Sequence, residues 1–347
     1  MKIADVTIGR DQRPFIIAEV SANHNGSLER AMEIVDAAAE AGAQAVKLQT
    51  YTADTMTIDK RDGEFLITDP DSLWTGYSLY QLYAEAHTPW EWHEPIFKRA
   101  RERGLIAFSS PFDETAVDFL EDLDVPAYKI ASFECVDLPL IRRVAATGKP
   151  MIISTGLATV SEIEAAVQAA REGGCTELAL LKCTSSYPST PENSNILTIP
   201  HMREMFGCEI GLSDHTLGIG AAMAAVAHGA SIVEKHVTLR REDGGFDSAF
   251  SLEPEELKAL VDDSERAWQA LGSVRYGASE AERESTIYRR SLYFVKELAA
   301  GETITSDSVR SIRPGYGISP GFLDVVIGKR MKQDVSPGTP VGWSILE

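Results

Sequence analysis

The sequence predicts a (β/α)8 barrel followed by a small β-rich domain. Eight short apolar segments rich in β-branched residues recur within the first 240 of the 347 residues. Helical patterns separate most of these segments, and several of the patterns end in glycine, a common residue at helix C-termini. Strands that alternate with helices pair in parallel, and eight such units within about 270 residues suit a closed barrel. A doubly wound open sheet is the alternative.

The first strand is expected at 15–20 (FIIAEV), and the first helix begins at Leu28, after the loop SANHNGS. Ser27 is well placed to cap that helix. The other expected strands are AVKLQ (45–49), LIAFSS (105–110), AYKIAS (127–132), PMIIST (150–155), LALLKC (178–183), EIGLSD (209–214) and SIVEKH (231–236). Further helical patterns lie at 91–104, 116–123, 140–148, 160–174 and 218–229.

Composition changes near the end of the barrel pattern. We expect the barrel to occupy residues 1–272, a polar linker 273–288, and a β-rich domain with Pro/Gly turns 289–347. Residues 286–347 hold eight Lys or Arg and six Asp or Glu, whereas the rest of the chain is strongly acidic. A domain of about 60 residues is too small to bury a large core alone. We therefore expect this domain to pack against its own barrel or against the barrel of a partner subunit.

Charge and composition exclude several classes of protein. The net charge of −19 argues against nucleic-acid binding, because no basic field neutralises phosphates. No apolar run reaches the ~18 residues that span a bilayer, and the N-terminus lacks a signal-peptide core. Four cysteines without CxxC spacing suit a reducing compartment. These features predict a cytoplasmic protein that binds neither nucleic acid nor membranes.

The carboxyl ends of the expected strands are unusually polar, and this is where a barrel carries its active site. The polar residues there include Glu19, Lys47, Gln49, Ser109, Ser110, Lys129, Ser132, Ser154, Lys182, Ser213, Asp214, His215, Glu234, Lys235 and His236. Any single lysine in such a place suits a structural ion pair. Ammonium and hydroxyl groups that converge from most of the strands indicate a site for an anion, either a phosphate or a carboxylate.

Two histidines end neighbouring strands. His215 and His236 follow the seventh and eighth expected strands, with Asp214 and Glu234 beside them. Two imidazoles aimed at one space can hold a divalent cation with positions left for water. The structural alternative is one hydrogen-bonded core histidine and one surface histidine. His24 lies in the loop after the first strand. A role in the site and a place in a plain turn are equally compatible with this position.

Eight sequence motifs follow one another along the chain: IIAEVSANHNGSLERA, AVKLQTY, FSSPFDETAVDFL, VPAYKIASFE, STGLAT, LLKCTSSYP, GLSDHTLG and EKHVTL. They resemble the motifs of the sialic acid synthase family. The C-terminal segment with SIRPGYGI resembles that family's antifreeze-like (SAF) domain. The words SANHNGSLE, LWTGYSLYQLYAEAHTPWEWH and KIASFE look most like the pseudaminic acid synthase branch. Sialic and legionaminic acid synthases usually carry GxNH at the first strand and KIASGE at the fourth.

The resemblance implies a reaction between phosphoenolpyruvate (PEP) and an N-acetylated amino sugar in its aldehyde form. The products would be phosphate and a nine-carbon 2-keto acid. For the pseudaminic acid branch the sugar would be 2,4-diacetamido-2,4,6-trideoxy-L-altrose. The alternatives are N-acetylneuraminate or legionaminic acid synthesis from another N-acetyl amino sugar.

The resemblance also assigns residues to roles. Glu19 would act near the reacting carbons as an acid/base or orienting group. The residues implied to hold PEP are Lys47, Ser110, Lys129, Ser132, Ser154, Ser185 and Ser213. His215 and His236 would bind a divalent metal ion, expected to be Mn²⁺, with Mg²⁺ or Co²⁺ as alternatives. The implied sugar contacts are Gln49, Glu134, Tyr187 and Asp247. Arg313 would reach the sugar from the C-terminal domain, which in this family caps the partner's barrel in a homodimer.

Two other classes of function stay open. A class I aldolase would use a barrel lysine such as Lys129 or Lys182 to form a Schiff base with its substrate. A non-catalytic sugar-binding protein would use the C-terminal domain alone. The set of Glu19, two lysines and two histidines at the strand ends argues against the second class, because a binding module has no need of it.

Overall fold

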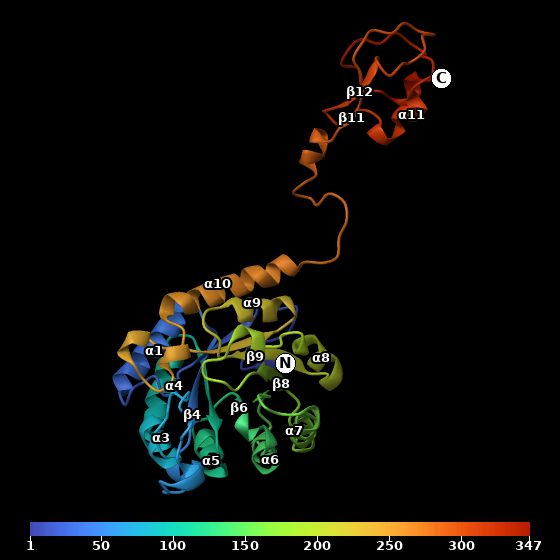
Figure 1. Ribbon diagram of the computed structural model, residues 1–347. Coiled ribbons are helices and arrows are strands. Elements are labelled where there is room, and N and C mark those ends of the chain that lie inside the picture. Colours follow the sequence, from blue (N-terminus) through green and yellow to red (C-terminus); the bar gives the residue numbers. More distant parts are fainter. The chain divides into compact units, whose positions relative to one another are not determined.

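Eight parallel strands close into a barrel in the computed structural model, which describes residues 1–347 (Figure 1). Hydrogen bonds link the strands in chain order, and the last strand pairs with the first. The strands are β3 (Phe15–Glu19), β4 (Ala45–Thr50), β5 (Ile106–Pro111), β6 (Tyr128–Ile130), β7 (Met151–Ser154), β8 (Leu178–Cys183), β9 (Glu209–Asp214) and β10 (Ile232–His236). The predicted barrel is thus confirmed, and the open sheet is excluded.

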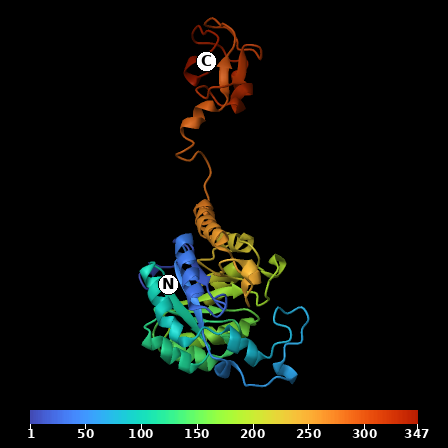
Figure 2. The ribbon, with the colours of Figure 1, turned by 90° about the vertical axis from the view of Figure 1, so that its left-hand side faces the viewer.

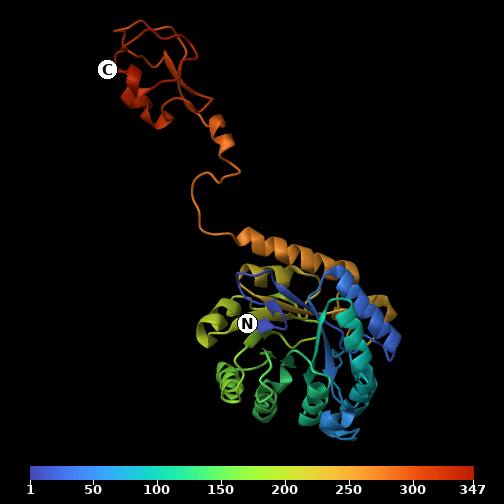
Figure 3. The ribbon, with the colours of Figure 1, turned by 180° about the vertical axis from the view of Figure 1, so that it is seen from behind.

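Helices surround the barrel, as Figures 1 and 3 show from opposite sides. The longer ones are α1 (Leu28–Ala41), α3 (Leu79–Ala86), α4 (His93–Glu102), α5 (Glu114–Asp122), α6 (Leu138–Ala145), α7 (Val160–Glu172), α8 (Thr198–Phe206), α9 (Gly220–Ala227) and α10 (Pro254–Leu271). Ser27 caps α1 as expected, since its side chain accepts a hydrogen bond from the Arg30 amide. Gly42 ends the helix at φ 88°, a left-handed conformation that glycine adopts without strain.

The connection from β4 to β5 is the longest in the barrel. It holds the short helix α2 (Ala53–Met56), α3, and α4 after the 3-10 turn at Trp90–Trp92. The other 3-10 turns of the barrel unit are Gly63–Phe65, Phe133–Val136, Pro191–Asn193, Arg241–Asp243 and Ser248–Phe250. This extra length gives the chain a long segment beside the carboxyl end of the barrel, in addition to the usual loops.

A short antiparallel hairpin of β1 (Lys2–Ile3) and β2 (Val6–Thr7) precedes the barrel. It adds the buried side chains of Ile3 and Ile8 to the barrel's apolar core. The sequence interpretation did not include this hairpin, because two-residue strands carry almost no periodic signal.

Close packing within the barrel requires glycine at one strand position. A Cβ atom at Gly211, in β9, would lie 2.4 Å from the Ile232 carbonyl oxygen and 2.6 Å from a Leu181 methyl carbon. Strands that are buried on both faces read as continuous apolar runs, and Gly211 lets β9 approach its neighbours within such a run.

The chain divides into two compact units, Met1–Gly272 and Ser273–Glu347. The second unit carries β11 (Ser291–Phe294) and β12 (Val309–Ile312), which pair antiparallel, and the short helix α11 (Leu323–Val326). It also has 3-10 turns at Glu284–Tyr288, Pro320–Phe322 and Trp343–Ile345. Its apolar cluster, which includes Leu292, Phe294 and Met331, is separate from that of the barrel. Figure 2 shows how little regular structure this unit contains.

Helices of this chain do not combine the length and apolar character needed to cross a membrane.

Candidate active site

Four charged side chains from four strands meet at the carboxyl end of the barrel. Lys47 Nζ lies 2.7 Å from Glu19 Oε2 and 3.8 Å from Glu234 Oε1. Lys129 Nζ lies 3.4 Å from the same oxygen of Glu234. All four residues are at most 4% exposed. Burying charges this deeply costs several kcal/mol for each one, so the mutual pairing is what makes the arrangement tolerable. We call these four residues the mouth cluster.

Polar side chains of neighbouring strands complete the mouth cluster. Lys47 Nζ donates to Ser110 Oγ at 3.2 Å, and Gln49 Nε2 donates to Glu19 Oε1 at 3.0 Å. Ser213 Oγ donates to Glu234 Oε1 at 3.3 Å. Hydroxyl, amide and ammonium groups thereby surround two carboxylates, and the ammonium and hydroxyl groups are the donors that an anion needs.

Burial and pairing shift the ionisation of the mouth cluster in opposite directions. Burial raises the pKa of Glu19, and the charge of Lys47 offsets this only in part. Burial lowers the pKa of Lys129, and the attraction of Glu234 does not restore it. For Lys47 and Glu234 the paired charges outweigh burial, so the pKa of Lys47 is raised and that of Glu234 is lowered. Glu19 and Lys129 are therefore the members that change protonation most easily.

Several buried polar atoms at the same end of the barrel lack a hydrogen-bond partner. They include Ser154 Oγ, Glu134 Oε2, Glu234 Oε2 and His236 Nδ1. Buried polar atoms in proteins are nearly always paired, so a group of exceptions at one place marks a site for a polar ligand. Burial also raises the pKa of Glu134 to about 7.

The loops after β6, β7 and β8 meet beside the mouth cluster. Ser132 Oγ accepts a hydrogen bond from the Gly156 amide at 3.1 Å. A Cβ atom at Gly156 would lie 2.1 Å from Ser185 Oγ and 2.8 Å from Ser132 Oγ. Only glycine therefore lets these two hydroxyl groups approach the backbone of the third loop.

The two histidines lie together, with ring centroids 5.3 Å apart, and both are less than 10% exposed. The alternative of one core and one surface histidine is thus excluded. His215 Nδ1 lies 2.9 Å from the Thr184 carbonyl oxygen, so it carries the proton and leaves Nε2 as a free electron-pair donor. His236 Nδ1 is buried without a hydrogen-bond partner. These two imidazoles are suited to fill two coordination positions of a divalent metal ion.

The rest of a metal's coordination shell would have to come from water or substrate. No group of three or more His, Cys, Asp or Glu side chains in the chain is arranged to hold a metal ion. Asp247 Oδ2 is the nearest carboxylate oxygen to His236 among the ion pairs, 3.9 Å from Nδ1. Asp247 is also hydrogen-bonded to Ser21, and burial raises its pKa to about 7.

The implied sugar contacts border the histidine pair. The Tyr187 ring lies 4.5 Å from the His215 ring and 5.3 Å from Phe250, between centroids. Asp247 lies in the loop after β10, and Glu134 in the turn after β6. Tyr187 thus contacts His215 and Asp247 lies near His236, while Gln49 of β4 is hydrogen-bonded to Glu19.

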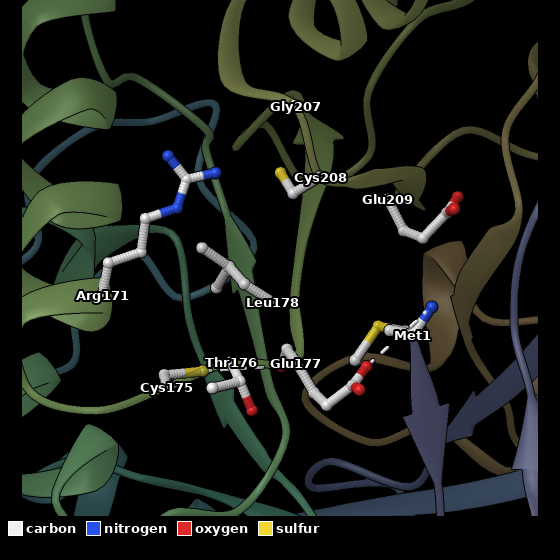
Figure 4. A pocket seen from close by; sticks show the side chains of 9 residues that line it. All are labelled: Met1, Arg171, Cys175, Thr176, Glu177, Leu178, Gly207, Cys208 and Glu209. Atoms are coloured by element: carbon white, nitrogen blue, oxygen red, sulfur yellow. Dashed lines mark hydrogen bonds and ion pairs between the residues drawn. The ribbon is translucent and has the colours of Figure 1, made fainter.

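A cavity of about 410 Å³ lies away from this site, among residues before and at the start of β8 and β9 (Figure 4). Its polar groups are already paired. Arg171 Nη2 donates to the Phe206 carbonyl at 2.6 Å, and Glu209 pairs with Arg203 at 2.9 Å. Since these residues are at the amino ends of the strands, the cavity is not part of the candidate active site.

Comparison with known proteins identifies the family. The model of the NeuB family matches residues 34–276, and that of the SAF domain matches residues 289–347.

The chain belongs to the NeuB family.

Similar proteins agree with this assignment over nearly the full length. Pseudaminic acid synthase of Campylobacter jejuni is 42% identical over 328 residues, which cover 94% of this chain and 95% of that protein. Pseudaminic acid synthase of Helicobacter pylori is 40% identical and covers 97% of this chain and 98% of its own. A crystal structure of N-acetylneuraminic acid synthetase from Leptospira borgpetersenii in complex with citrate has a TM-score of 0.74 and 31% identity, and covers 83% of this chain and 95% of that one.

Among the strand-end residues of this NeuB-family chain, the structure separates those that face the barrel interior from those that do not. Lys235 pairs with Asp214 at 2.9 Å, outside the mouth cluster. Lys182 donates to the Cys183 carbonyl at 2.8 Å and contacts no carboxylate. Ser109 is hydrogen-bonded to Thr50 rather than to Lys47. Successive side chains of a strand point to opposite faces, so alternation decides which residues reach the site.

Sequence reasoning missed one central residue. The sequence places Glu234 beside the two histidines, whereas the structure shows that it contacts both lysines of the mouth cluster. Glu234 and His236 are two residues apart on the same strand, so their side chains point to the same face of the barrel wall. This spacing could have indicated that Glu234 faces the site. Cys183 was also missed: its Sγ lies 3.9 Å from His215 Nδ1, and burial would raise its pKa, but the hydrogen bond from His215 contributes to lowering it to about 7.

Two further residues considered in the sequence are His24 and Arg313. His24 is buried against Trp92, at 5.6 Å between ring centroids, and its Nδ1 accepts from the Gly26 amide. The turn uses Nδ1, whereas Nε2 is buried without a hydrogen-bond partner, as are the orphaned atoms beside the mouth cluster. Arg313 is exposed and follows β12 in the second compact unit.

Replacement of Lys47 by methionine should destabilise the barrel. It leaves Glu19 buried without its cation, which costs about 3–5 kcal/mol of unfolding free energy. Lys182→Met is the matched control and should cost less than about 1.5 kcal/mol, because that lysine makes only neutral hydrogen bonds. Guanidinium unfolding followed by circular dichroism measures both variants. Equal losses of unfolding free energy in the two variants would contradict a stabilising pair of Lys47 and Glu19.

The loss in Lys47→Met should depend on pH. The ordinary pKa of Glu19 is 4.5, and burial without Lys47 raises the folded value further. A carboxyl group with a raised folded pKa opposes folding once the unfolded chain ionises. The loss of unfolding free energy in Lys47→Met should therefore be small below pH 4.5 and grow as the pH rises toward 7.

Proposed function

We propose that this chain is a pseudaminic acid synthase. It condenses PEP with 2,4-diacetamido-2,4,6-trideoxy-L-altrose and releases phosphate and a nine-carbon 2-keto acid. The observation that carries the proposal is the mouth cluster, since Lys47 and Lys129 lie among hydroxyl groups at the carboxyl end of the barrel. Its support from similar proteins is the 40–42% identity to two pseudaminic acid synthases.

The residues suit the two ends of PEP. Lys47 and Lys129 offer ammonium groups to the phosphate and carboxylate, and Ser110, Ser132, Ser154, Ser185 and Ser213 offer hydroxyl donors. Such groups stabilise the charge that develops as phosphate leaves. The net charge of −19 does not prevent binding of an anion, because salt limits the far field to about 10 Å while the lysines act at contact.

The chemistry needs a proton donor and acceptor near the reacting carbons. The methylene carbon of PEP attacks the sugar aldehyde, a bond forms between them, and the aldehyde oxygen takes up a proton. Water then adds to C2 of PEP and loses one proton. As the C2–O bond to phosphate breaks, the new hydroxyl group at C2 gives its remaining proton to the released phosphate and becomes the keto oxygen. Glu19 suits the proton transfer, because burial raises its pKa and thereby favours a carboxyl group that can donate a proton.

A divalent metal ion, most simply Mn²⁺ and otherwise Mg²⁺ or Co²⁺, would act as a Lewis acid toward the aldehyde oxygen when held by His215 and His236. The support is the orphaned Nδ1 of His236 and the fixed tautomer of His215. Around the histidines, Tyr187, Asp247, Glu134 and Gln49 would orient the sugar.

Two alternatives use the same barrel. The first alternative is N-acetylneuraminate or legionaminic acid synthesis from another N-acetyl amino sugar, because the chain resembles an N-acetylneuraminic acid synthetase in structure. A class I aldolase is the remote one. Borohydride trapping in the presence of substrate separates them, since only the aldolase forms an imine with Lys129 or Lys182.

We further propose that the chain acts as a homodimer in which Arg313 of one subunit completes the sugar site of the other. The support is the SAF domain match and the resemblance of SIRPGYGI to that family's motif. A guanidinium group would donate to the N-acetyl carbonyl or hydroxyl groups of the sugar, a charged hydrogen bond worth about 1.5–3 kcal/mol.

Metal removal should abolish activity. We expect EDTA to stop phosphate release from PEP, and Mn²⁺, Co²⁺ or Mg²⁺ to restore it. His215→Ala or His236→Ala should cut turnover by orders of magnitude and leave the circular dichroism spectrum unchanged, because residues at the barrel mouth contribute little to the core. His201→Ala, on the exposed face of α8, is the control and should retain activity. Full activity of His236→Ala in EDTA would end the metal assignment.

Substrate choice tests the main proposal. Phosphate release from PEP should be far more efficient with 2,4-diacetamido-2,4,6-trideoxy-L-altrose than with N-acetylmannosamine. A pocket that buries a methyl group leaves the hydroxyl of the other sugar unpaired, which can cost about 100-fold in kcat/KM. Comparable efficiency with both sugars, or a preference for N-acetylmannosamine, would overturn pseudaminic acid synthesis as the function.

The dimer proposal predicts complementation. Arg313→Ala and Lys129→Ala homodimers should each be nearly inactive. A mixed dimer pairs the intact barrel of the first with the intact C-terminal domain of the second, so one complete site forms. Activity should return to about half the wild-type value by two-fold symmetry. Arg310→Ala, on the neighbouring exposed position of β12, should be active by itself. A mixed dimer as inactive as its parents would show that Arg313 acts within its own chain or not at all.

A further inference from the structure

The long connection after β4 folds back on itself beside the active site. Backbone hydrogen bonds join Ile67 to Tyr77 and Gly76 to Ile67, both at 2.9 Å, and Leu66 bridges to Ser78. Residues 66–78 therefore form a closed loop just before α3, which we call the mouth flap. The side chains of Trp74 and Tyr77 are half-buried, whereas Leu73 is 47% exposed.

Trp74 ties the mouth flap to two segments of the candidate sugar site. Its indole Nε1 donates to the Phe246 carbonyl oxygen at 3.1 Å, and Phe246 directly precedes Asp247. Its ring lies 5.8 Å from the Tyr187 ring, which in turn lies 4.5 Å from His215, between centroids. Tyr77 supports the same contact, since its ring lies 5.9 Å from that of Phe246.

The hydrogen bond to Phe246 determines what Trp74 can offer a ligand. Nε1 is the only polar atom of the indole ring, and the protein already uses it. The remaining surface of the ring is apolar. A methyl group against this surface is favourable, while a hydroxyl group there finds no partner and keeps its desolvation cost.

We propose that Trp74 is a specificity-determining residue that forms an apolar wall of the sugar site and selects the methyl group at C6 of a 6-deoxy sugar over a hydroxymethyl group. This inference rests on the proposed function, because it takes Tyr187 and Asp247 to contact the sugar. A purely structural alternative exists, in which Trp74 only anchors the mouth flap through its hydrogen bond to Phe246.

The two roles predict different behaviour of two variants. Trp74→Phe keeps an apolar ring but loses the hydrogen bond to Phe246. Trp74→Gln supplies amide groups to the wall, which can pair with a hydroxyl group of the ligand. If Trp74 is a specificity residue, Trp74→Gln changes the choice of sugar and Trp74→Phe does not. If it is an anchor, both variants lower activity toward every sugar alike.

The test compares two sugars that differ only at C6: 2,4-diacetamido-2,4,6-trideoxy-L-altrose and its 6-hydroxy counterpart. The quantity measured is the ratio of their kcat/KM values, by phosphate release from PEP. We expect Trp74→Gln to lower this ratio about tenfold or more, and Trp74→Phe to keep it within about threefold. The KM for PEP should stay near the wild-type value in both. Leu73→Ala, on the same flap, should change neither the ratio nor the KM values.

The outcomes separate this inference from the function on which it rests. If the wild-type enzyme releases phosphate with neither sugar, the proposed function fails and the role of Trp74 fails with it. If the wild type uses the 6-deoxy sugar but Trp74→Gln leaves the ratio unchanged, the inference alone is overturned. Circular dichroism checks that each variant folds. Should Trp74→Gln not fold, the same ratio in Trp74→His, a second polar variant, decides the question.

Discussion

The pairing of Lys47 and Lys129 with Glu19 and Glu234 is the interaction on which the active site depends. Each charge is buried and each comes from a different strand. They meet only because the closed barrel fixes the register, with Glu19 beside Lys47 on one side and beside His236 on the other. A shift of one residue in any of these strands would turn its side chains to the opposite face. The barrel therefore supplies the precise alignment that makes burial of four charges possible.

The mouth cluster has no net charge when all four members are ionised, which bears on how it can receive an anion. The carboxyl group of Glu19 has a raised pKa and the ammonium group of Lys129 a lowered one, both because of burial. An anion that enters would favour the protonated form of both groups, so the cluster would be positive while the anion is bound.

Under the proposed function, selectivity for the sugar would lie in other elements. The loops after β8 and β10 carry Tyr187 and Asp247, and the connection after β4 adds the mouth flap. Loops at the carboxyl ends of barrel strands can vary without disturbing the core, because they contribute few of its contacts. One barrel with a fixed anion site can in this way serve amino sugars that differ in a single substituent.

The barrel can be predicted from the sequence alone, because each of its eight strands is an apolar run of the right length followed by a helix or a turn. The gathering of polar residues at the carboxyl ends can be predicted in the same way. Which of these residues act together depends on the folded barrel. Lys235 and Lys182 look like Lys47 and Lys129 in the sequence, but they pair elsewhere. Glu234 joins both lysines of the cluster because the closed barrel places its strand, β10, between β9 and β3. Trp74 reaches Tyr187 across more than 100 residues of chain. The physical reason is that strand composition is a local property, whereas side-chain partners depend on register, on pleat alternation and on how a long loop folds back.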